Sequence, residues 1–354
     1  MAAKEPQGME VPVKYSEKSW EIAGKYAALL GQMPSSFSSA IRTTRSEIGE
    51  EAPDAPLKRL GKSLMRRLVR SPALKAPIYF AAQSLYPAKF QNSRLVDEFG
   101  LMAMFGAKEL SSLVGLIYLC RRAQRIVGAE SFEPFMDDIH RKVEMGAHVG
   151  RVIERIGADV GIVLGATRHV AFCSYMSQDE KGWKGYQRLL KSNNSFCDFD
   201  YELQRWGCTH VQVASCILQA MGYGRTFASG ISFGIDPVSE TSRDSEDNFY
   251  KWYIADVWTR SLVESAKIPD IRHRGSYYPM KEEIDPLMEH AKKMRESNRS
   301  GWWLNKRPED LPTTEIIEAT GEESQQELEE LETEGDVGLD TLDEVVDEID
   351  SSFA

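Results

Sequence analysis

The sequence predicts an all-α protein, in which a body of many helices precedes an acidic tail. Apolar residues recur at helical spacing from Tyr15 almost to residue 300, and no period-two run bounded by hairpin turns occurs. No Lys or Arg follows Arg307, whereas 309–350 contains 18 acidic residues. Residues 1–308 therefore carry 43 basic and 36 acidic side chains, a formal charge of +7 in a chain whose total is −11.

Composition limits the class of protein. With 354 residues, 42% of them hydrophobic, the chain is long enough for a large core. No apolar run approaches the roughly 18 residues that span a bilayer. The first 14 residues lack the apolar stretch of a signal peptide, so we expect a cytoplasmic protein. The five cysteines show no CxxC spacing, which favours buried free thiols over a zinc site or a disulfide framework.

The helices are expected in a nearly continuous series. After a disordered N-terminus of residues 1–14, the first helix extends toward Pro34, which breaks its pattern. In 56–70 leucines at helical spacing form one stripe. In the next helix Pro72 suits the first turn, whereas Pro77 should bend the helix or shift its start. Further helices are expected over 110–126, 134–156, 158–176, 179–195, 209–221, 245–266 and 278–297.

Four segments carry patterns that occur in the same order in one known family. Residues 71–86 contain a Pro-x-Leu start, and 101–119 place a glycine before an apolar helix. Residues 202–222, ELQRWGCTHVQVASCILQAMG, place a glutamate, an aromatic-Gly pair and a Thr-His pair before an apolar stripe, and 253–256 end in Ala-Asp. Together they resemble the HDOD domain, a bacterial signalling module related to HD-type phosphohydrolases. The resemblance spans roughly residues 30–265.

The resemblance implies a multi-helix bundle and a division of the chain. It implies an N-terminal helical part over 15–130 and an HD-like helical bundle over 131–300. The remainder, 301–354, is expected to be a largely disordered tail. Its acidic residues repel one another, and it has too few apolar residues to offset the entropy of ordering.

The family's metal chemistry is not expected in this chain. An HD-type hydrolase holds one or two metal ions on His and Asp side chains, and the metal activates a water molecule that attacks phosphate. None of the six histidines here precedes an Asp. Where the family has its HD pair, the sequence reads GATRHVAFCSYM, with Arg168 or His169 at the histidine position. An arginine does not coordinate a cation, so the departure predicts a protein without metal, cofactor or catalysis.

Five residues of these segments form a candidate cluster: Glu202, Thr209, His210, Arg168 and His169. One interpretation is a remnant site that senses a small ligand. The other is structural, with Thr209 as the N-cap of the following helix and Glu202 accepting a hydrogen bond at the helix start. We favour the structural interpretation, since a lone histidine among apolar neighbours is usually a hydrogen-bonded core residue.

Three functions are compatible with these patterns. The first, which we favour, is a non-catalytic regulatory protein of signal transduction that binds another protein through its helical body and its tail. The second is a nucleic-acid-binding regulator whose acidic tail competes for a basic surface. The third is a divergent metal-dependent phosphohydrolase with ligands from His140, His169, His210 and Asp256. The candidate basic surface consists of Lys58, Arg59, Lys62, Arg66, Arg67, Arg70, Arg121, Arg122 and Arg125.

Within the tail, aliphatic residues recur at helical intervals between Asp and Glu. They are Leu339, Leu342, Val345, Val346 and Ile349. An acidic amphipathic segment of this kind fits an apolar groove on a partner protein. The alternative is a solvating tail with incidental aliphatic residues, and the sequence leaves both interpretations open.

Overall fold

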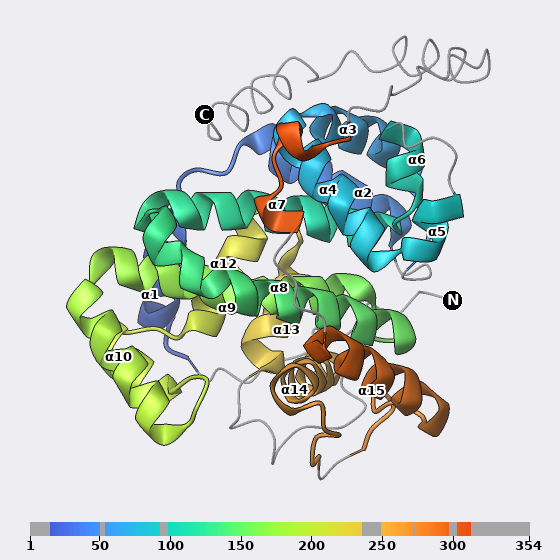
Figure 1. Ribbon diagram of the computed structural model, residues 1–354. Helices are drawn as coiled ribbons and strands as arrows, with labels where there is room; N and C mark the ends of the chain where they lie inside the picture. The colour runs from blue at the N-terminus through green and yellow to red at the C-terminus, as the bar shows by residue number, and fades with distance from the viewer. Residues whose placement is uncertain are drawn as a thin grey trace, which may run out of the picture.

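The computed structural model describes residues 15–49, 54–92, 98–235, 249–271, 274–296 and 303–312 (Figure 1). Three long helices, α7 (Ala107–Val127), α8 (Ala129–Val152) and α9 (Ala158–Gln178), cross the centre of the molecule. The other described elements are α1 (Glu17–Ala28), α2 (Ser35–Ile48), α3 (Arg59–Arg70), α4 (Pro72–Leu85), α5 (Pro87–Asn92), α6 (Glu98–Ala103), α10 (Glu180–Asn193), α11 (Phe199–Trp206), α12 (His210–Ala220), α13 (Arg225–Gly234), α14 (Tyr250–Ser265), α15 (Lys281–Glu296) and the 3-10 turns η2 (Trp303–Asn305) and η3 (Pro308–Asp310).

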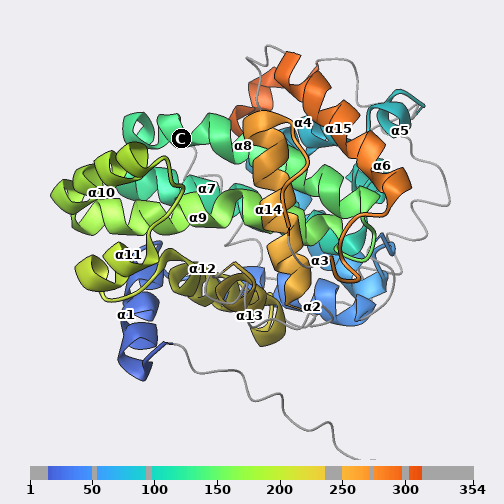
Figure 2. The ribbon, with the colours of Figure 1, turned by 90° about the horizontal axis from the view of Figure 1, so that it is seen from below.

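The shorter helices surround the central three in groups that come from different parts of the chain. Helices α2 to α6 gather at one end of the molecule, and η2 packs against α4 among them (Figure 1). On another side, α12 packs on α9 and is joined to α13. Helix α14 crosses both α8 and α9 (Figure 2). Segments far apart in the chain are therefore brought together along α9.

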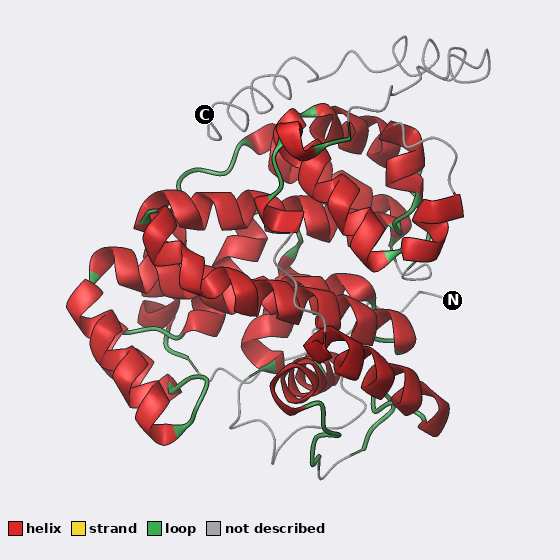
Figure 3. Cartoon of the chain, viewed as in Figure 1, coloured by secondary structure: helices red, strands yellow, loops and turns green. Residues whose placement is uncertain are grey.

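Every regular element of the described residues is a helix, which confirms the all-α prediction (Figure 3). The predicted disordered N-terminus and nearly all of the acidic tail, with its aliphatic residues at 339–349, lie outside the described residues. Of the described helices, none has both the length and the apolar character that crossing a bilayer requires.

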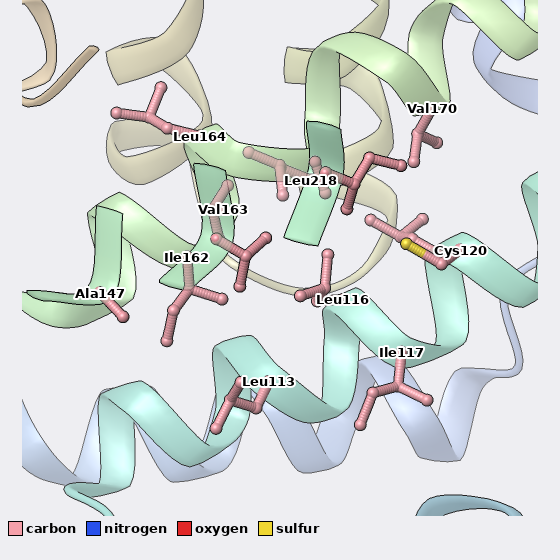
Figure 4. Packing of buried hydrophobic residues seen from close by; sticks show 14 of the residues in the cluster. Leu113, Leu116, Ile117, Cys120, Ala147, Ile162, Val163, Leu164, Val170 and Leu218 are labelled. Carbon is pink, nitrogen blue, oxygen red and sulfur yellow. The ribbon is translucent and has the colours of Figure 1, made fainter. Parts of the chain in front are cut away.

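One hydrophobic cluster includes side chains from all three central helices and from their neighbours. Helices α7 and α9 are apolar on most sides, which is typical of helices buried within a bundle. Leu113 and Leu116 of α7 face Ile162 and Val163 of α9 (Figure 4). The cluster runs across the predicted division between residues 130 and 131, which lies in the first turn of α8.

Helices α8 and α9 approach each other at backbone distance because glycines face across their interface. A Cβ atom on Gly146 would lie 2.3 Å from the carbonyl oxygen of Gly161, and one on Gly161 would lie 1.9 Å from that of Gly146. Gly150 meets Gly157 in the same way, and Gly165 lies against the backbone of α8. Spacing by four residues keeps these glycines on one face of each helix. Helix α9 is thereby fixed against α8 along its first half.

Most predicted helices lie within a few residues of their expected bounds. Two of them, α8 and α4, contain a proline that the sequence analysis expected to start, bend or shift the helix. Helix α8 begins at Ala129, directly after Gly128 with its left-handed φ of 82°, so Pro134 lies inside the helix instead of starting it. Helix α4 begins at Pro72 and contains Pro77, which therefore does not shift the helix start.

Helix α2 was not predicted, because Pro34 was interpreted as a break. In the structure Pro34 is the N-cap residue of α2, and its fixed φ of −59° suits a helix start. The buried residues Phe37, Ile41, Thr44 and Ile48 then follow at helical spacing. Helices α5, α6, α11 and α13 are not among the predicted helices either. Helices α5 and α6 have six residues each, and α11 and α13 are short and have a glycine cap at one end.

Candidate functional site

A small cavity of about 20 Å³ lies where two of the HDOD-like segments meet α9, at the segment that contains Arg168. Arg168 from α9, His210 from α12 and Asp256 from α14 line it, so the structure brings together three residues that the sequence analysis singled out. Lys142 from α8 and Arg260 from α14 complete the charged lining. A cavity of this size accommodates about one water molecule.

On one side of this cavity, Asp138 of α8 contacts three basic side chains. Its Oδ2 lies 2.7 Å from Nζ of Lys142, 3.3 Å from Nη2 of Arg168 and 2.9 Å from Nε2 of His169. Although burial opposes ionisation, the hydrogen bond and charge of His169, with the charges of Lys142 and Arg168, hold the pKa of Asp138 well below its usual range. Burial lowers the pKa of His169 to about 4, and burial together with Arg168 lowers the pKa of Lys142 to about 8.

Beside the cavity, Glu202 is a fully buried carboxylate whose partners all lie inside the protein. It accepts hydrogen bonds from the backbone N–H of His210 at 2.7 Å, from Nδ1 of the same residue at 2.9 Å, and from the hydroxyl of Tyr186. A carboxylate only accepts, so the proton of this imidazole lies on Nδ1. Glu202 thus fixes both the backbone and the ring at the start of α12.

Thr209 and Gln212 make the hydrogen bonds at the start of α12. Thr209 is the N-cap residue, and its backbone N–H donates to Oε1 of Gln212 at 3.0 Å. The same oxygen accepts a hydrogen bond of 2.8 Å from the hydroxyl of Ser19 in α1. The Thr-His segment therefore ties together α1, α11 and α12 and contributes His210 to the cavity wall.

The resemblance to HD-type proteins implies a place for a metal ion here, and the residues present do not fit one. Lys142 and Arg168 contribute positive charges to the lining, which repel a cation. The carboxylate of Asp256 already accepts from Nε of Arg260 at 2.8 Å. Nδ1 of His210 is engaged with Glu202, so this residue could offer a metal ion only its Nε2. Within the described ranges, no three His, Cys, Asp or Glu side chains converge as a metal site.

Two further histidines of the phosphohydrolase hypothesis lie away from the cavity lining. The ring of His140 packs edge-on against Trp303 of η2, with 5.0 Å between ring centroids. His169 turns its Nε2 toward Asp138 and its ring edge toward Phe135. Of the four proposed ligands, only His210 and Asp256 line the same cavity.

A second, larger hollow of about 920 Å³ lies between α2, α7, α9, α13 and α14, and we call it the basic cleft. Cations outnumber carboxylates in its lining. The cations are Arg42, Arg45, Lys108, Arg155, Arg225 and Lys251, and the carboxylates are Glu154 and Asp159. These residues are spread over five helices and the loops between them, so no local pattern in the sequence predicts the cleft.

Arg45 is held firmly in the basic cleft. Its Nη2 lies 2.7 Å from Oδ2 of Asp159, and Nη1 lies 3.4 Å from the hydroxyls of Ser111 and Ser112. The guanidinium also lies 4.1 Å from the ring centroid of Phe227, at cation–π distance. These contacts restrict its rotamers and give the cleft a rigid centre.

The predicted basic surface on α3 is partly neutralised by its neighbours. Oε2 of Glu98 lies 3.5 Å from Nε of Arg66 and 3.1 Å from Nε of Arg70. Arg66 and Lys62 lie over the ring of Phe99, at 4.5 and 4.9 Å from its centroid. Lys58 and Arg59 are exposed at the start of the helix, and Arg67 is half-buried.

Two of the three arginines at the end of α7 make hydrogen bonds within the protein. Arg121 donates to the carbonyl oxygen of Leu304 at 2.9 Å and thereby holds η2, and burial lowers its pKa. Arg122 donates to the hydroxyl of Tyr118 at 2.6 Å. Of the three, only Arg125 is exposed.

Several site residues were missed by sequence reasoning, and some of them had a local signal. The missed residues Asp138 and Lys142 are opposite charges four residues apart on one helix face, and the missed Arg260 has the same spacing from Asp256. That spacing alone is common on solvated surfaces, so only the packing of α8, α9 and α14 reveals that these pairs meet at one cavity.

Comparisons of the chain with protein-family models, with curated proteins and with solved structures found no match. The resemblance to HDOD domains therefore stays a prediction. The contacts within the described residues are the support for any functional assignment.

Proposed function

We propose that this protein is a non-catalytic regulatory protein of signal transduction that acts by binding another protein. The observation that carries the proposal is the lining of the 20 Å³ cavity. Lys142 and Arg168 stand at the junction of the segments that resemble a metal-dependent hydrolase, and their charges are balanced by Asp138. The cavity has room for about one water molecule, which is far too little for a phosphate ester.

The proposed partner is a protein that contacts the helical body and the acidic tail. The resemblance implies a signalling role, and the 18 acidic residues of 309–350 with their interspersed aliphatic residues suit a groove with basic margins. The nucleic-acid alternative has less support, because Arg121 and Arg122 serve internal contacts and Glu98 balances part of α3.

The absence of catalysis is tested by metal analysis and a phosphohydrolase assay on the full-length protein. We expect less than one equivalent of bound metal after purification, and no change in melting temperature on addition of Mn²⁺ or Mg²⁺. Hydrolysis of a phosphodiester that depends on Mn²⁺, and that disappears in a His210→Ala variant of unchanged fold, would show an enzyme and refute the proposal.

Partner binding is tested by affinity capture from a lysate of the source organism, with the full chain and a 1–312 truncation as baits. A protein retained by the full chain and lost on truncation identifies a tail-dependent partner. One retained by both baits places the contact on the helical body. Capture of nucleic acid by the truncated bait, without any protein partner, would favour the second hypothesis instead.

A further inference from the structure

We propose that the basic cleft is a binding site for a small molecule that carries one or more phosphate groups. The inference goes beyond the proposed function, since the cleft lies at the first turn of α9 and shares no lining residue with the 20 Å³ cavity. It is carried by an excess of positive charge in a concave site, by a partly buried lysine and by exposed backbone at a helix start.

The excess of charge follows from the ion pairs of the lining. Arg45 is matched by Asp159, and Arg155 is matched by Glu283, each with a shortest nitrogen–oxygen distance of 2.7 Å. After these two pairs the lining holds one further carboxylate, Glu154, which is exposed. Besides Lys108, it holds three further cations, which are Arg42, Arg225 and Lys251. An anion in the cleft would therefore meet a positive potential from several sides.

Lys251 is the most informative of these cations. It lies in the first turn of α14, is partly buried, and forms no ion pair within the described part of the chain. Burial lowers its pKa, and the nearby charges of Lys108 and Arg45 act in the same direction while Asp159 acts against them. A cation placed among cations and away from water destabilises the free protein, and a bound anion would relieve that destabilisation.

Backbone donors at the cleft add to the side-chain charges. Helices α9 and α13 begin there with glycine N-caps, Gly157 and Gly224, whose φ values are 91° and 83°. Glycine has no side chain with which to cap the first-turn N–H groups. At Gly224 a Cβ atom would meet no atom within 4 Å, and Arg225 and Thr226 beside it are exposed. The start of α13 is therefore accessible to a ligand oxygen.

The size and form of the cleft favour a small molecule over a polymer. Its volume of about 920 Å³ falls within the roughly 300–1,000 Å³ typical of small-molecule sites. Rings of Phe227 and Phe249 in the lining offer apolar contact beside the cations. The basic residues of α3, which would have to extend the surface for a nucleic acid, are partly balanced by Glu98.

The test is calorimetric titration of the full-length protein with inorganic pyrophosphate and with ADP, in a buffer without divalent metal ions. We expect saturable binding to the wild type, and a loss of affinity of about tenfold or more in Lys251→Gln and in Arg42→Gln. Lys293→Gln is the matched control, because Lys293 is exposed and pairs with Glu289 at 2.6 Å on α15, away from the cleft. Its affinity should equal that of the wild type.

Melting temperatures of the unliganded variants establish that each is folded, and Arg42 is an exposed residue whose replacement leaves the core untouched. Failure of both probes to bind the wild type overturns the proposal, as does equal affinity in all four proteins. A single-stranded oligonucleotide, or a vesicle of anionic phospholipid, that binds far more tightly than ADP and loses affinity in the same two variants would also overturn it. In that case the phosphate groups recognised belong to a polymer or to a membrane.

Discussion

The 20 Å³ cavity and the basic cleft lie along the same helix, α9, and differ in the balance of positive and negative side chains. At the cavity, Asp138 and Asp256 form ion pairs with the surrounding cations, and the space holds about one water molecule. In the cleft, cations exceed carboxylates around an open volume of about 920 Å³. The difference is the basis on which we propose a structural role for the first region and anion binding for the second.

The largest effect is expected from a change that separates α8 from α9 and so disturbs both regions. Gly161→Ala places a Cβ atom 1.9 Å from the carbonyl oxygen of Gly146, and neither backbone has room to move within the core. We expect a loss of about 3 kcal/mol or more in the free energy of unfolding, measured by urea denaturation. Anion binding in the cleft should weaken too, because Asp159 and Arg45 shift with α9.

Gly185→Ala on α10 is the matched control for this prediction. A Cβ atom there would meet the hydroxyl oxygen of Tyr201 at 3.5 Å, an ordinary contact distance. Alanine is the better helix former, so the variant should gain about 0.5–1 kcal/mol. A loss of stability in Gly185→Ala as large as in Gly161→Ala would show that the close approach of α8 and α9 is not the cause.

The next largest effect is expected from a change beside the cavity that leaves the basic cleft intact. Glu202→Ala leaves the Tyr186 hydroxyl and two N–H groups of His210 buried without their acceptor. We expect a loss of about 3 kcal/mol in the free energy of unfolding, with unchanged affinity for pyrophosphate at the distant cleft. Glu180→Ala on the exposed face of α10, where Lys184 pairs with it, should leave the free energy of unfolding nearly unchanged. A stable Glu202→Ala variant would contradict the structural role of this carboxylate.

The two regions also differ in how far the sequence predicts them. Local periodicity located most of the helices. The Thr-His, Ala-Asp and GATRHV segments contain His210, Asp256 and Arg168, which the structure places around one cavity. Each of those residues belongs to a recognisable segment. The basic cleft has no such segment, because its cations come from separate helices and become neighbours only when α2, α13 and α14 pack around the start of α9.

Through the cavity region, a fall in pH should lower the free energy of unfolding. Burial holds the pKa of His169 at about 4, below the 6.5 of an unperturbed histidine, so the fold favours the neutral ring. That contribution is fully present above pH 6.5 and is lost as the pH falls through 4. Between pH 7 and pH 4.5 we expect the free energy of unfolding to fall by about 2 kcal/mol more in the wild type than in His169→Gln, which keeps a donor for Asp138. Parallel pH profiles for the two proteins would contradict this assignment.

The cleft should show a pH dependence of the same sign in a more alkaline range, and its effect is the smallest. Because burial lowers the pKa of Lys251, the charged form destabilises the folded state at pH 7, and stability should rise as the pH rises through the folded pKa. Lys251→Gln is therefore expected to be more stable than the wild type by about 0.5–1 kcal/mol at pH 7, while it loses affinity for pyrophosphate. Lys293→Gln, which removes an exposed and paired charge, should change neither quantity appreciably. If Lys251→Gln is no more stable than the wild type at pH 7, the unbalanced charge does not destabilise the free protein, and the two regions differ in shape alone.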